Sequence, residues 1–525
     1  MNMQENNKTY WASPLKYAII LLIGVLLGIF LKGNLSLKGL QADNSIPVQE
    51  IIDLVKSKYV DKITNDSADI NFVNNYLSQL DPHSVYIAPS ELAAVNEQLA
   101  SNFKGIGVEF QQIRDSIFIA YVLKGGPADK AGLKVGDILL KANDTLQLSG
   151  KKWDGEAIRS KLKGPANSKL KLLVLSNKTN KVIVIERDNV SSSSIDASYQ
   201  IKPGVGYIRI NKFADRTYEA FMQALEPLIK DSIKSLVLDL RGNGGGLMSE
   251  AVAIADELIP GNKLLVYTQG AHSPRADYYS KREGLFEKGN VTVWMDESSA
   301  SASEVLAGAL QDWDRATIIG RPSYGKGLVQ QQFNLSNGGA LRLTISKYYT
   351  PLGRNIQRSF EKGKLAYEHD YVNRIEEHAA GKVDTVAKGK AYKTPNGKTV
   401  YGGGGIFPDQ WVIGSDIILD SAYSKLLDEN LMNDFVLQWY VKEQNNLKSF
   451  KNTTEFIKSY QKVDTWNALY QYASPSQKNN LKSLEKNKIY IQNRLLALMA
   501  RMQWYKQGYH EALNRLDGKY LVLLP

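Results

Sequence analysis

The sequence predicts a multidomain α/β protein with a β-rich domain and helical regions toward both ends. Its 525 residues exceed what one hydrophobic core usually holds, so about two to four domains are expected. Short β-rich runs separated by Gly, Asn and Asp begin at Phe103, and strands alternate with helical stretches from about Val205. Such alternation favours an α/β layer with parallel strands.

The composition excludes several kinds of site. The absence of cysteine rules out disulfides, thiolate catalysis and cysteine-based zinc sites. The five histidines lie far apart and never at the spacing of metal ligands, so no metal is expected. The net charge is +11, but acidic residues are interspersed with the basic ones and no nucleic-acid signature is present. Nucleic acid is therefore not an expected partner.

An apolar segment near the amino terminus predicts a membrane anchor. Tyr17 to Leu31 carries no charge and is bracketed by Lys16 and Lys32. With its flanks the segment reaches about 17 residues, the lower limit for a spanning helix. A cleaved signal segment with a weak site at Ala42 is the alternative. Either interpretation implies export, and we expect the rest of the chain on the periplasmic side of the inner membrane in the cell envelope.

The hydrophobic pattern and the composition change several times along the remaining chain. Apolar residues at helical spacing predict an N-terminal helical region, and the tail after the core has the same character. A stretch rich in Lys, Gly and His between the core and a short strand resembles a surface excursion. The expected segments are 1–44 (anchor or signal and linker), 45–101 (helical), 102–190 (β-rich), 195–357 (α/β core), 358–400 (polar insertion), 401–415 (closing core strand) and 416–525 (helical).

The run VLDLRGNGGG is a first candidate for chemistry. A hydrophobic strand ending at Asp239 leads into four glycines and then a helix. Glycines let backbone N–H groups point into open space, and a helix start adds its positive dipole end. This pattern is typical of an anion or oxyanion site, with an unliganded tight turn as the equal alternative. A dinucleotide fingerprint does not fit because position 247 is leucine.

The segment Gly320–Gly327 is a second candidate because it nearly spells a phosphate-binding loop. Its last position is glycine instead of Ser or Thr, and the following LVQQQF predicts a strand instead of a helix. Nucleotide binding by this loop remains a rival interpretation, and a solvated turn lysine is another. If its surroundings desolvate Lys326, the neutral amine can act as a general base.

Ser301 is a third candidate, at the junction between the strand VTVWM and a helix. Together with Glu304 it forms a capping-box pattern, and capping is the ordinary role of such a serine. The same position lies beside helix-start N–H groups that can stabilise an oxyanion. Neither a G-x-S-x-G elbow nor a nearby histidine supports a Ser–His–Asp site.

The turn formed by Gly105, Ile106, Gly107 and Val108 is a fourth candidate. Consecutive backbone N–H groups in such a turn can capture a C-terminal carboxylate, and an adjacent strand edge can pair with the peptide. The downstream run GGPADKAGLKVGD adds further turns. An ordinary β turn is the alternative.

These pieces, in this order, resemble the carboxyl-terminal processing peptidases, also called tail-specific proteases. SASASEVLAGALQD and RATIIGRPSYGKGLVQ resemble their nucleophile helix and lysine segment, and VLDLRGNGGG resembles their oxyanion turn. LDPHSVYI, GGPADKAGLKVGDILLKAND and GIFPD resemble the segment before the PDZ domain, the PDZ domain and the closing core strand. The resemblance spans roughly residues 45 to 415 and implies a serine endopeptidase with a crotonase-like or Clp-protease-like α/β core.

The resemblance also implies residue roles. Ser301 would be the nucleophile, Lys326 the general base and Gln330 the residue that positions the lysine. The family requires no metal or cofactor, and its partners are proteins or peptides with exposed C-termini that the PDZ domain binds. A rearrangement driven by the PDZ domain could leave Ser301 and Lys326 apart at rest.

The oxyanion hole would be formed by the N–H of Ala302 and that of Gly245 or Gly246. A catalytically silent PDZ scaffold of the same fold is the main rival, and the intact catalytic motifs favour an enzyme. The helical tail could be structural, cover the active site, recruit an adaptor or drive homo-oligomerisation.

Overall fold

The computed structural model describes residues 51–52, 58, 67–150, 153–383, 389–414 and 416–524. The chain divides into two compact units, residues 1–72 and 73–525, and every site discussed below lies within the second unit. The expected anchor from Tyr17 to Leu31 and the linker after it lie outside the described residues. In the part of the chain that is described, no helix has both the length and the apolar character to cross a bilayer.

The core of the second unit is a six-stranded sheet. Five of its strands run parallel and one edge strand is antiparallel, as the alternation of strands and helices predicts. The central strands are buried on both faces, which explains their nearly continuous apolar sequences. In spatial order the strands are β10 (Ile195–Lys202), β11 (Val205–Ile210), β12 (Ser235–Asp239), β15 (Asn290–Met295), β16 (Ala316–Gly320) and β21 (Gln410–Trp411).

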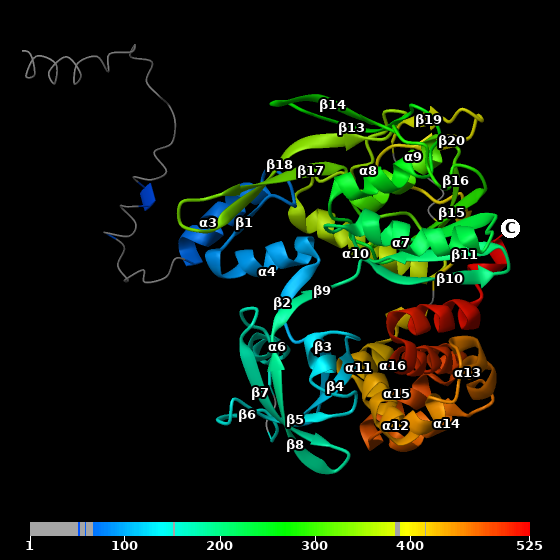
Figure 1. The fold of residues 1–525 in the computed structure, drawn as a ribbon. Coiled ribbons are helices and arrows are strands. Elements are labelled where there is room, and N and C mark those ends of the chain that lie inside the picture. Colours follow the sequence, from blue (N-terminus) through cyan, green and yellow to red (C-terminus); the bar gives the residue numbers. More distant parts are fainter. Residues whose placement is uncertain are drawn as a thin grey trace, which may run out of the picture. The chain divides into compact units, whose positions relative to one another are not determined.

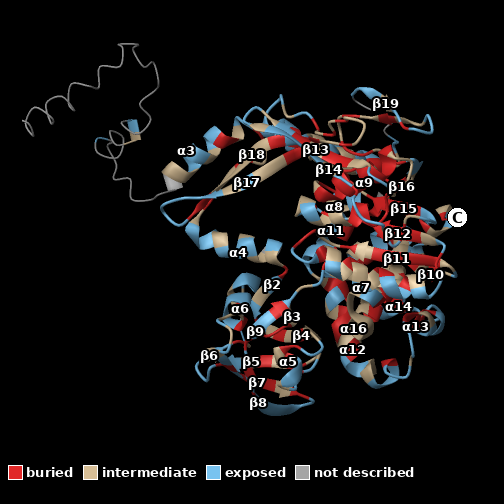
Figure 2. Cartoon of the chain, turned by 45° about the horizontal axis from the view of Figure 1, so that its top comes forward, coloured by how far each residue is buried: buried red, intermediate tan, exposed pale blue. Residues whose placement is uncertain are grey.

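Three helices connect these strands and share one hydrophobic core with them. They are α7 (Thr217–Lys230), α8 (Met248–Asp256) and α9 (Ala302–Asp312). Every residue of α9 is buried, so its small and apolar side chains meet protein on all sides (Figure 2). The loops before α8 and α9 both leave the carboxyl ends of parallel strands, which is where α/β sheets place their sites.

A second sheet contains β1 (Val85–Ile87), β13 (Leu264–Gly270), β14 (Ser273–Tyr279), β17 (Leu328–Asn334) and β18 (Ala340–Tyr349). The expected helical region before the β-rich domain does form α3 (Ser67–Ser78) and α4 (Pro89–Ala100). However, the strand β1 lies between these helices and pairs with β18. Three residues are too few to show a strand period in the sequence, so the purely helical expectation for 45–101 was wrong at this point.

The β-rich domain folds around its own core of buried Ile, Leu and Val side chains. Its sheet has the order β3-β4-β5-β7-β8, with β6 (Leu146–Gln147) beside β5, and the helices α5 (Pro127–Lys130) and α6 (Gly155–Leu162) belong to the domain. A ribbon of β2 (Asn102–Gly105) and β9 (Asp188–Ser191) joins it to the rest of the chain (Figure 1). The sheet strands are β3 (Val108–Ile113), β4 (Ser116–Val122), β5 (Ile138–Ala142), β7 (Lys169–Ser176) and β8 (Thr179–Glu186).

The segment after residue 415 is helical, as predicted, and encloses a separate hydrophobic core. We call this segment the C-terminal helical domain. Its longest helix, α16, is interrupted by non-helical backbone at Trp504 and Tyr505. Its helices are α11 (Ser421–Asp428), α12 (Leu431–Leu447), α13 (Thr453–Tyr460), α14 (Thr465–Tyr472), α15 (Pro475–Ser483) and α16 (Lys488–Asp517).

The polar insertion is not a simple surface excursion. It contains α10 (Lys364–Ala379), β19 (Ala391–Lys393) and β20 (Thr399–Tyr401), and it buries Tyr367 and His378. A helix that buries only one face keeps a polar composition, which is why the sequence suggested full exposure. The closing strand β21 lies directly after GIFPD.

Candidate active site

Ser301 lies where the chain turns from β15 into α9. It is the residue before the first turn of the helix and has φ of 56° and ψ of −115°. Non-glycine residues rarely adopt this backbone conformation, and such outliers gather at functional sites. The N–H of Ala302 belongs to the first helical turn and lies at the positive end of the helix dipole.

The glycine-rich turn after β12 packs directly against Ser301. A Cβ atom on Gly245 would lie 2.7 Å from Ser301 Cβ and 2.8 Å from Ala302 N. The backbone of Gly245 has a φ of 94°. Only glycine therefore fits at this position. The side chain of Asn243 holds the turn, because its Oδ1 accepts the Gly245 N–H at 2.9 Å. Gly246 has a φ of 138°. Its backbone N–H donates no hydrogen bond to any described residue.

Lys326 approaches the same place from the loop between β16 and β17. Its Nζ donates to Gln330 Oε1 at 3.0 Å, and Gln330 Nε2 donates to the carbonyl of His83 at 2.6 Å. Burial lowers the pKa of Lys326, and the nearby charge of Arg342 lowers it further. Within the described chain, no hydrogen bond joins Lys326 Nζ to the Ser301 hydroxyl.

Glu304 links the serine turn to the lysine loop. Its Oε2 accepts the backbone N–H groups of Ser301 at 2.7 Å and Lys326 at 2.9 Å. Its Oε1 accepts the Gly325 N–H at 2.7 Å and the Ser323 hydroxyl. Burial raises the pKa of Glu304 to about 7, although these four donors all favour the ionised carboxylate. Sequence reasoning assigned Glu304 only to a helix cap and missed this link, since its partners are about twenty positions away.

These elements enclose a cavity of about 580 Å³. The catalytic and oxyanion residues expected from the sequence all line it, together with apolar side chains from α4, α8 and the second sheet. Arg342 and Lys212 are lining residues that the sequence did not indicate. The expected members at its wall are Gly245, Gly246, Ser301, Ala302, Lys326 and Gln330.

The loop Gly320–Gly327 does not form an open phosphate cradle. The N–H groups of Gly325 and Lys326 donate to Glu304, and that of Gly327 donates to Gln357 Oε1 at 2.8 Å. The chain then continues into β17, as the sequence indicated, so no helix N-terminus faces the loop. These engaged amides argue against the nucleotide-binding interpretation.

The segment before the β-rich domain and the polar insertion meet behind Gln330. The hydroxyl oxygen of Tyr367, on α10, lies 3.3 Å from His83 Nε2. The two rings pack edge to face. Burial, followed by the charge of Lys326, lowers the pKa of His83 to about 4. The described residues contain no group of three His, Asp or Glu side chains able to hold a metal ion.

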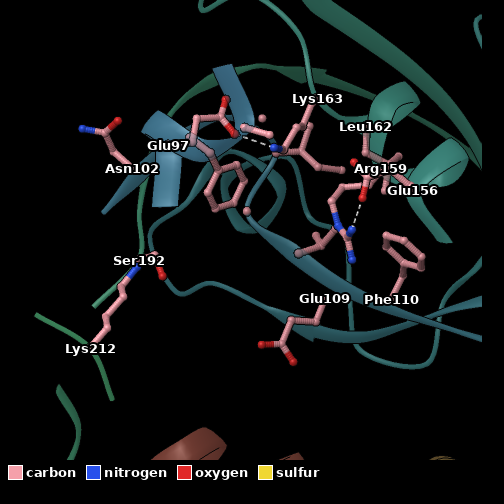
Figure 3. A pocket seen from close by; sticks show the side chains of 16 residues that line it. Glu97, Asn102, Glu109, Phe110, Glu156, Arg159, Leu162, Lys163, Ser192 and Lys212 are labelled. Atoms are coloured by element: carbon pink, nitrogen blue, oxygen red, sulfur yellow. Dashed lines mark hydrogen bonds and ion pairs between the residues drawn. The ribbon is translucent and has the colours of Figure 1, made fainter. Parts of the chain in front are cut away.

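A second cavity, of about 610 Å³, lies at the predicted carboxylate-binding turn. Gly105, Ile106, Gly107 and Val108 all line it. Figure 3 shows the side chains at its wall, where Phe110 and Leu162 provide apolar surface and charged residues surround them. Two ion pairs cross this wall, Lys163–Glu97 at 2.6 Å and the exposed pair of Arg159 with Glu156.

Comparison with known proteins identifies three regions. The model of peptidase family S41 matches residues 204–363, and that of the PDZ domain matches residues 118–176. A family of unknown function matches residues 422–505, within the C-terminal helical domain.

Several relatives match about three fifths of the chain. A probable CtpA-like serine protease of Staphylococcus aureus strain N315 is 32% identical over 342 residues, 64% of this chain and 68% of the relative. A carboxy-terminal-processing protease of Bartonella bacilliformis is 33% identical over 315 residues, 59% of this chain and 71% of the relative. Among solved structures, the photosystem II D1 C-terminal processing protease has 27% sequence identity and a TM-score of 0.35, covering 59% of this chain and 84% of its own.

Proposed function

Because the chain belongs to the carboxy-terminal processing serine proteases of peptidase family S41, we propose that Ser301 and Lys326 form its catalytic pair. The chain is a serine protease with a PDZ domain. The observation that carries the proposal is the cavity that brings Ser301, Lys326, Gln330 and the glycine-rich turn together. A catalytically silent scaffold would have no need of a half-buried lysine with a lowered pKa beside a strained serine.

The reaction follows from the chemistry of these groups. Neutral Lys326 accepts the proton of Ser301, whose oxygen attacks the scissile carbonyl. The tetrahedral intermediate then collapses to the acyl-enzyme: the C–N bond breaks, and protonated Lys326 gives its proton to the departing amine of the C-terminal fragment. Water hydrolyses the remaining ester and releases the other fragment. Lys326 lacks a hydrogen bond to the serine hydroxyl in the described chain, so substrate binding is proposed to align the two.

The negative charge of the tetrahedral intermediate needs two donors. Ala302 N–H supplies one from the helix start. We assign the second to Gly246, since the N–H of Gly245 already donates to Asn243. Each such donor typically contributes about 3 kcal/mol to the transition state.

The PDZ domain is proposed to bind the unstructured C-terminal tails of substrates. The turn from Gly105 to Val108 would hold the terminal carboxylate, and the edge strand β3 would pair with the tail. The apolar side chains of Phe110 and Leu162 favour an apolar last residue. Substrates would be exported proteins, and an anchor at Tyr17–Leu31 would hold the protease at the envelope membrane.

Cleavage of a model protein with an unstructured apolar tail tests the catalytic assignment. The full chain should cleave it, whereas Ser301→Ala and Lys326→Ala should not. Ser298→Ala and Lys347→Ala are matched controls outside the cavity and should retain activity. Equal activity of all five proteins would refute the assignment. Tail binding without cleavage by the unmodified protein would instead support a scaffold.

A further inference from the structure

One helix of the C-terminal helical domain, α16, contacts both the PDZ domain and the protease core. Apart from its contacts with the C-terminal helical domain, the PDZ domain is joined to the rest of the chain by the ribbon of β2 and β9 and by the ion pair Lys163–Glu97. A two-stranded ribbon alone is a flexible support. The contacts of α16 therefore help to fix the position of the PDZ groove relative to the catalytic cavity.

On the PDZ side, α16 holds Glu109. Arg501 forms an ion pair with its carboxylate, and the Tyr505 hydroxyl donates to Glu109 Oε1 at 2.7 Å. The ring of Tyr505 stacks on Tyr121 of β4, with centroids 3.6 Å apart. Arginine and tyrosine thus bind the same carboxylate, which fixes its position more closely than one surface ion pair would.

The strand that carries Glu109 is the one proposed to pair with substrate. β3 lies at the edge of its sheet, with β4 as its neighbour on one side, and Glu109 lines the groove. Two residues farther along β3, Gln111 Nε2 donates to Asp434 Oδ1 of α12 at 2.6 Å. Residues two apart share one face of a strand. The C-terminal helical domain therefore holds one face of the edge strand at two points.

On the core side, the contacts begin with the next residue of α16. Lys506 Nζ donates to Asp196 Oδ1 of β10 at 2.8 Å. Farther along, Asn514 Oδ1 accepts from Arg241 at 3.2 Å. Arg241 also binds Asp239, at the end of β12 and the start of the oxyanion turn. One short segment of α16 is thus fixed to both domains.

The backbone of α16 is distorted between the two sets of contacts. Tyr505 has φ of 54° and ψ of −145°, outside the helical region. A Cβ atom on Gly508 would lie 2.7 Å from the carbonyl oxygen of Ala500, so the chain beyond the distortion approaches the preceding turn closely. A strained residue persists only where its surroundings hold it, and here they are the partners of Tyr505 on the PDZ domain.

We propose that Arg501 and Tyr505 are positioning residues that hold the PDZ edge strand so that a bound tail leads into the catalytic cavity. This proposal rests on the proposed function of the PDZ groove. The groove and the catalytic cavity already share Lys212 as a lining residue, so the two lie next to each other. The C-terminal helical domain would then set how strongly tail binding assists cleavage, without contributing to the chemistry.

The test compares two versions of one peptide substrate in the full chain, one with a free C-terminal carboxylate and one with a C-terminal amide. The unmodified protein should prefer the free carboxylate, since only that form fills the carboxylate turn. In Arg501→Glu, the ratio of kcat/KM between the two peptides should fall about fivefold, through KM for the free peptide. Hydrolysis of the amidated peptide monitors whether the protease core is intact.

Charge reversal separates positioning from a general folding role. The double variant Arg501→Glu with Glu109→Arg restores the ion pair in the opposite sense and should return the ratio to within about twofold. Lys482→Glu makes the same charge change at an exposed site of the same domain and should leave the ratio unchanged. Tyr505→Phe removes one hydroxyl and should lower the ratio less than Arg501→Glu.

Two results would overturn the proposal. One is an unchanged ratio in Arg501→Glu, and the other is a loss that affects both peptides equally and is not rescued by the double variant. Failure of the proposed function gives a different result, because the unmodified protein would then not distinguish the two peptides or Ser301→Ala would still cleave them.

Discussion

Glu304→Gln tests whether the buried carboxylate holds the serine turn and the lysine loop together. The substitution keeps the size and shape of the side chain and removes only its charge and one acceptor oxygen. Four donors converge on the carboxylate, two at each oxygen. The change therefore alters the charge and the hydrogen bonds and leaves the packing unchanged.

The magnitude follows from counting acceptors. If the amide nitrogen of the new glutamine faces Gly325 and Ser323, the Gly325 N–H and the Ser323 hydroxyl proton both lose their acceptor. The Ser323 oxygen already accepts the Ile406 N–H at 2.6 Å. With the amide reversed, the N–H groups of Ser301 and Lys326 lose theirs. Two buried donors lose acceptors either way, at about 1–3 kcal/mol each, so we expect about 2–6 kcal/mol of destabilisation.

Hydrogen exchange followed by mass spectrometry should show this loss as faster exchange in the segments around Ser301 and Lys326. The kcat should fall about 10- to 100-fold, because the two reacting groups are no longer held in one geometry. Glu219→Gln, at an exposed glutamate on α7 that pairs with Arg216, is the matched control. Native exchange protection and native kcat in Glu304→Gln would refute the reasoning.

The pH dependence provides a second readout of the same substitution. Burial raises the pKa of Glu304 from 4.5 to about 7, so the folded protein binds the proton more tightly than the unfolded chain. The stability contributed by this group is therefore lost as pH rises from about 4.5 to about 7. Glu304→Gln should lack this component of the pH dependence.

Three further outcomes are expected. Because burial and Arg342 lower the pKa of Lys326, activity should rise with pH as the amine loses its proton, and Arg342→Met should move this rise to higher pH in a kcat/KM profile. Gly245→Ala should abolish cleavage while circular dichroism stays native, since the new Cβ would lie 2.7 Å from Ser301 Cβ. Asp312→Ala should lower the free energy of unfolding by about 3–5 kcal/mol, because it leaves Arg354 charged and fully buried without its carboxylate.

The sequence predicted the strands and helices of the core because their apolar patterns are long and uninterrupted. The helix after Ser301, the strand after Lys326 and the glycine-rich turn all lie where those patterns indicated. The cavity could be anticipated only through the resemblance to a known family, since Ser301 and Lys326 are joined by folding and not by a shared local pattern. The local pattern of Ser301 alone favoured a simple helix cap.

The links between distant segments could not be predicted from the sequence. The bond from Gln330 to the His83 carbonyl spans 247 positions and uses a main-chain acceptor, which leaves no residue-specific signal. The hold of α16 on Glu109 depends on the backbone distortion at Tyr505, which no pattern in that helix reveals. The polar insertion was judged exposed because its buried residues are few against a charged background.

The bond between Lys326 and Gln330 bears directly on how the lysine can serve as a base. A neutral amine has two N–H donors and one lone pair, and Gln330 Oε1 is an acceptor that takes one of those N–H groups at 3.0 Å. In the proposed mechanism, the lone pair is then left to accept a proton from Ser301. The side-chain amide of Gln330 is held in one orientation, because its Nε2 donates to the His83 carbonyl. This bond keeps Gln330 Oε1 facing the lysine. The bond to Gln330 therefore need not break when substrate aligns the pair, since it orients the lone pair while burial lowers the pKa of the amine.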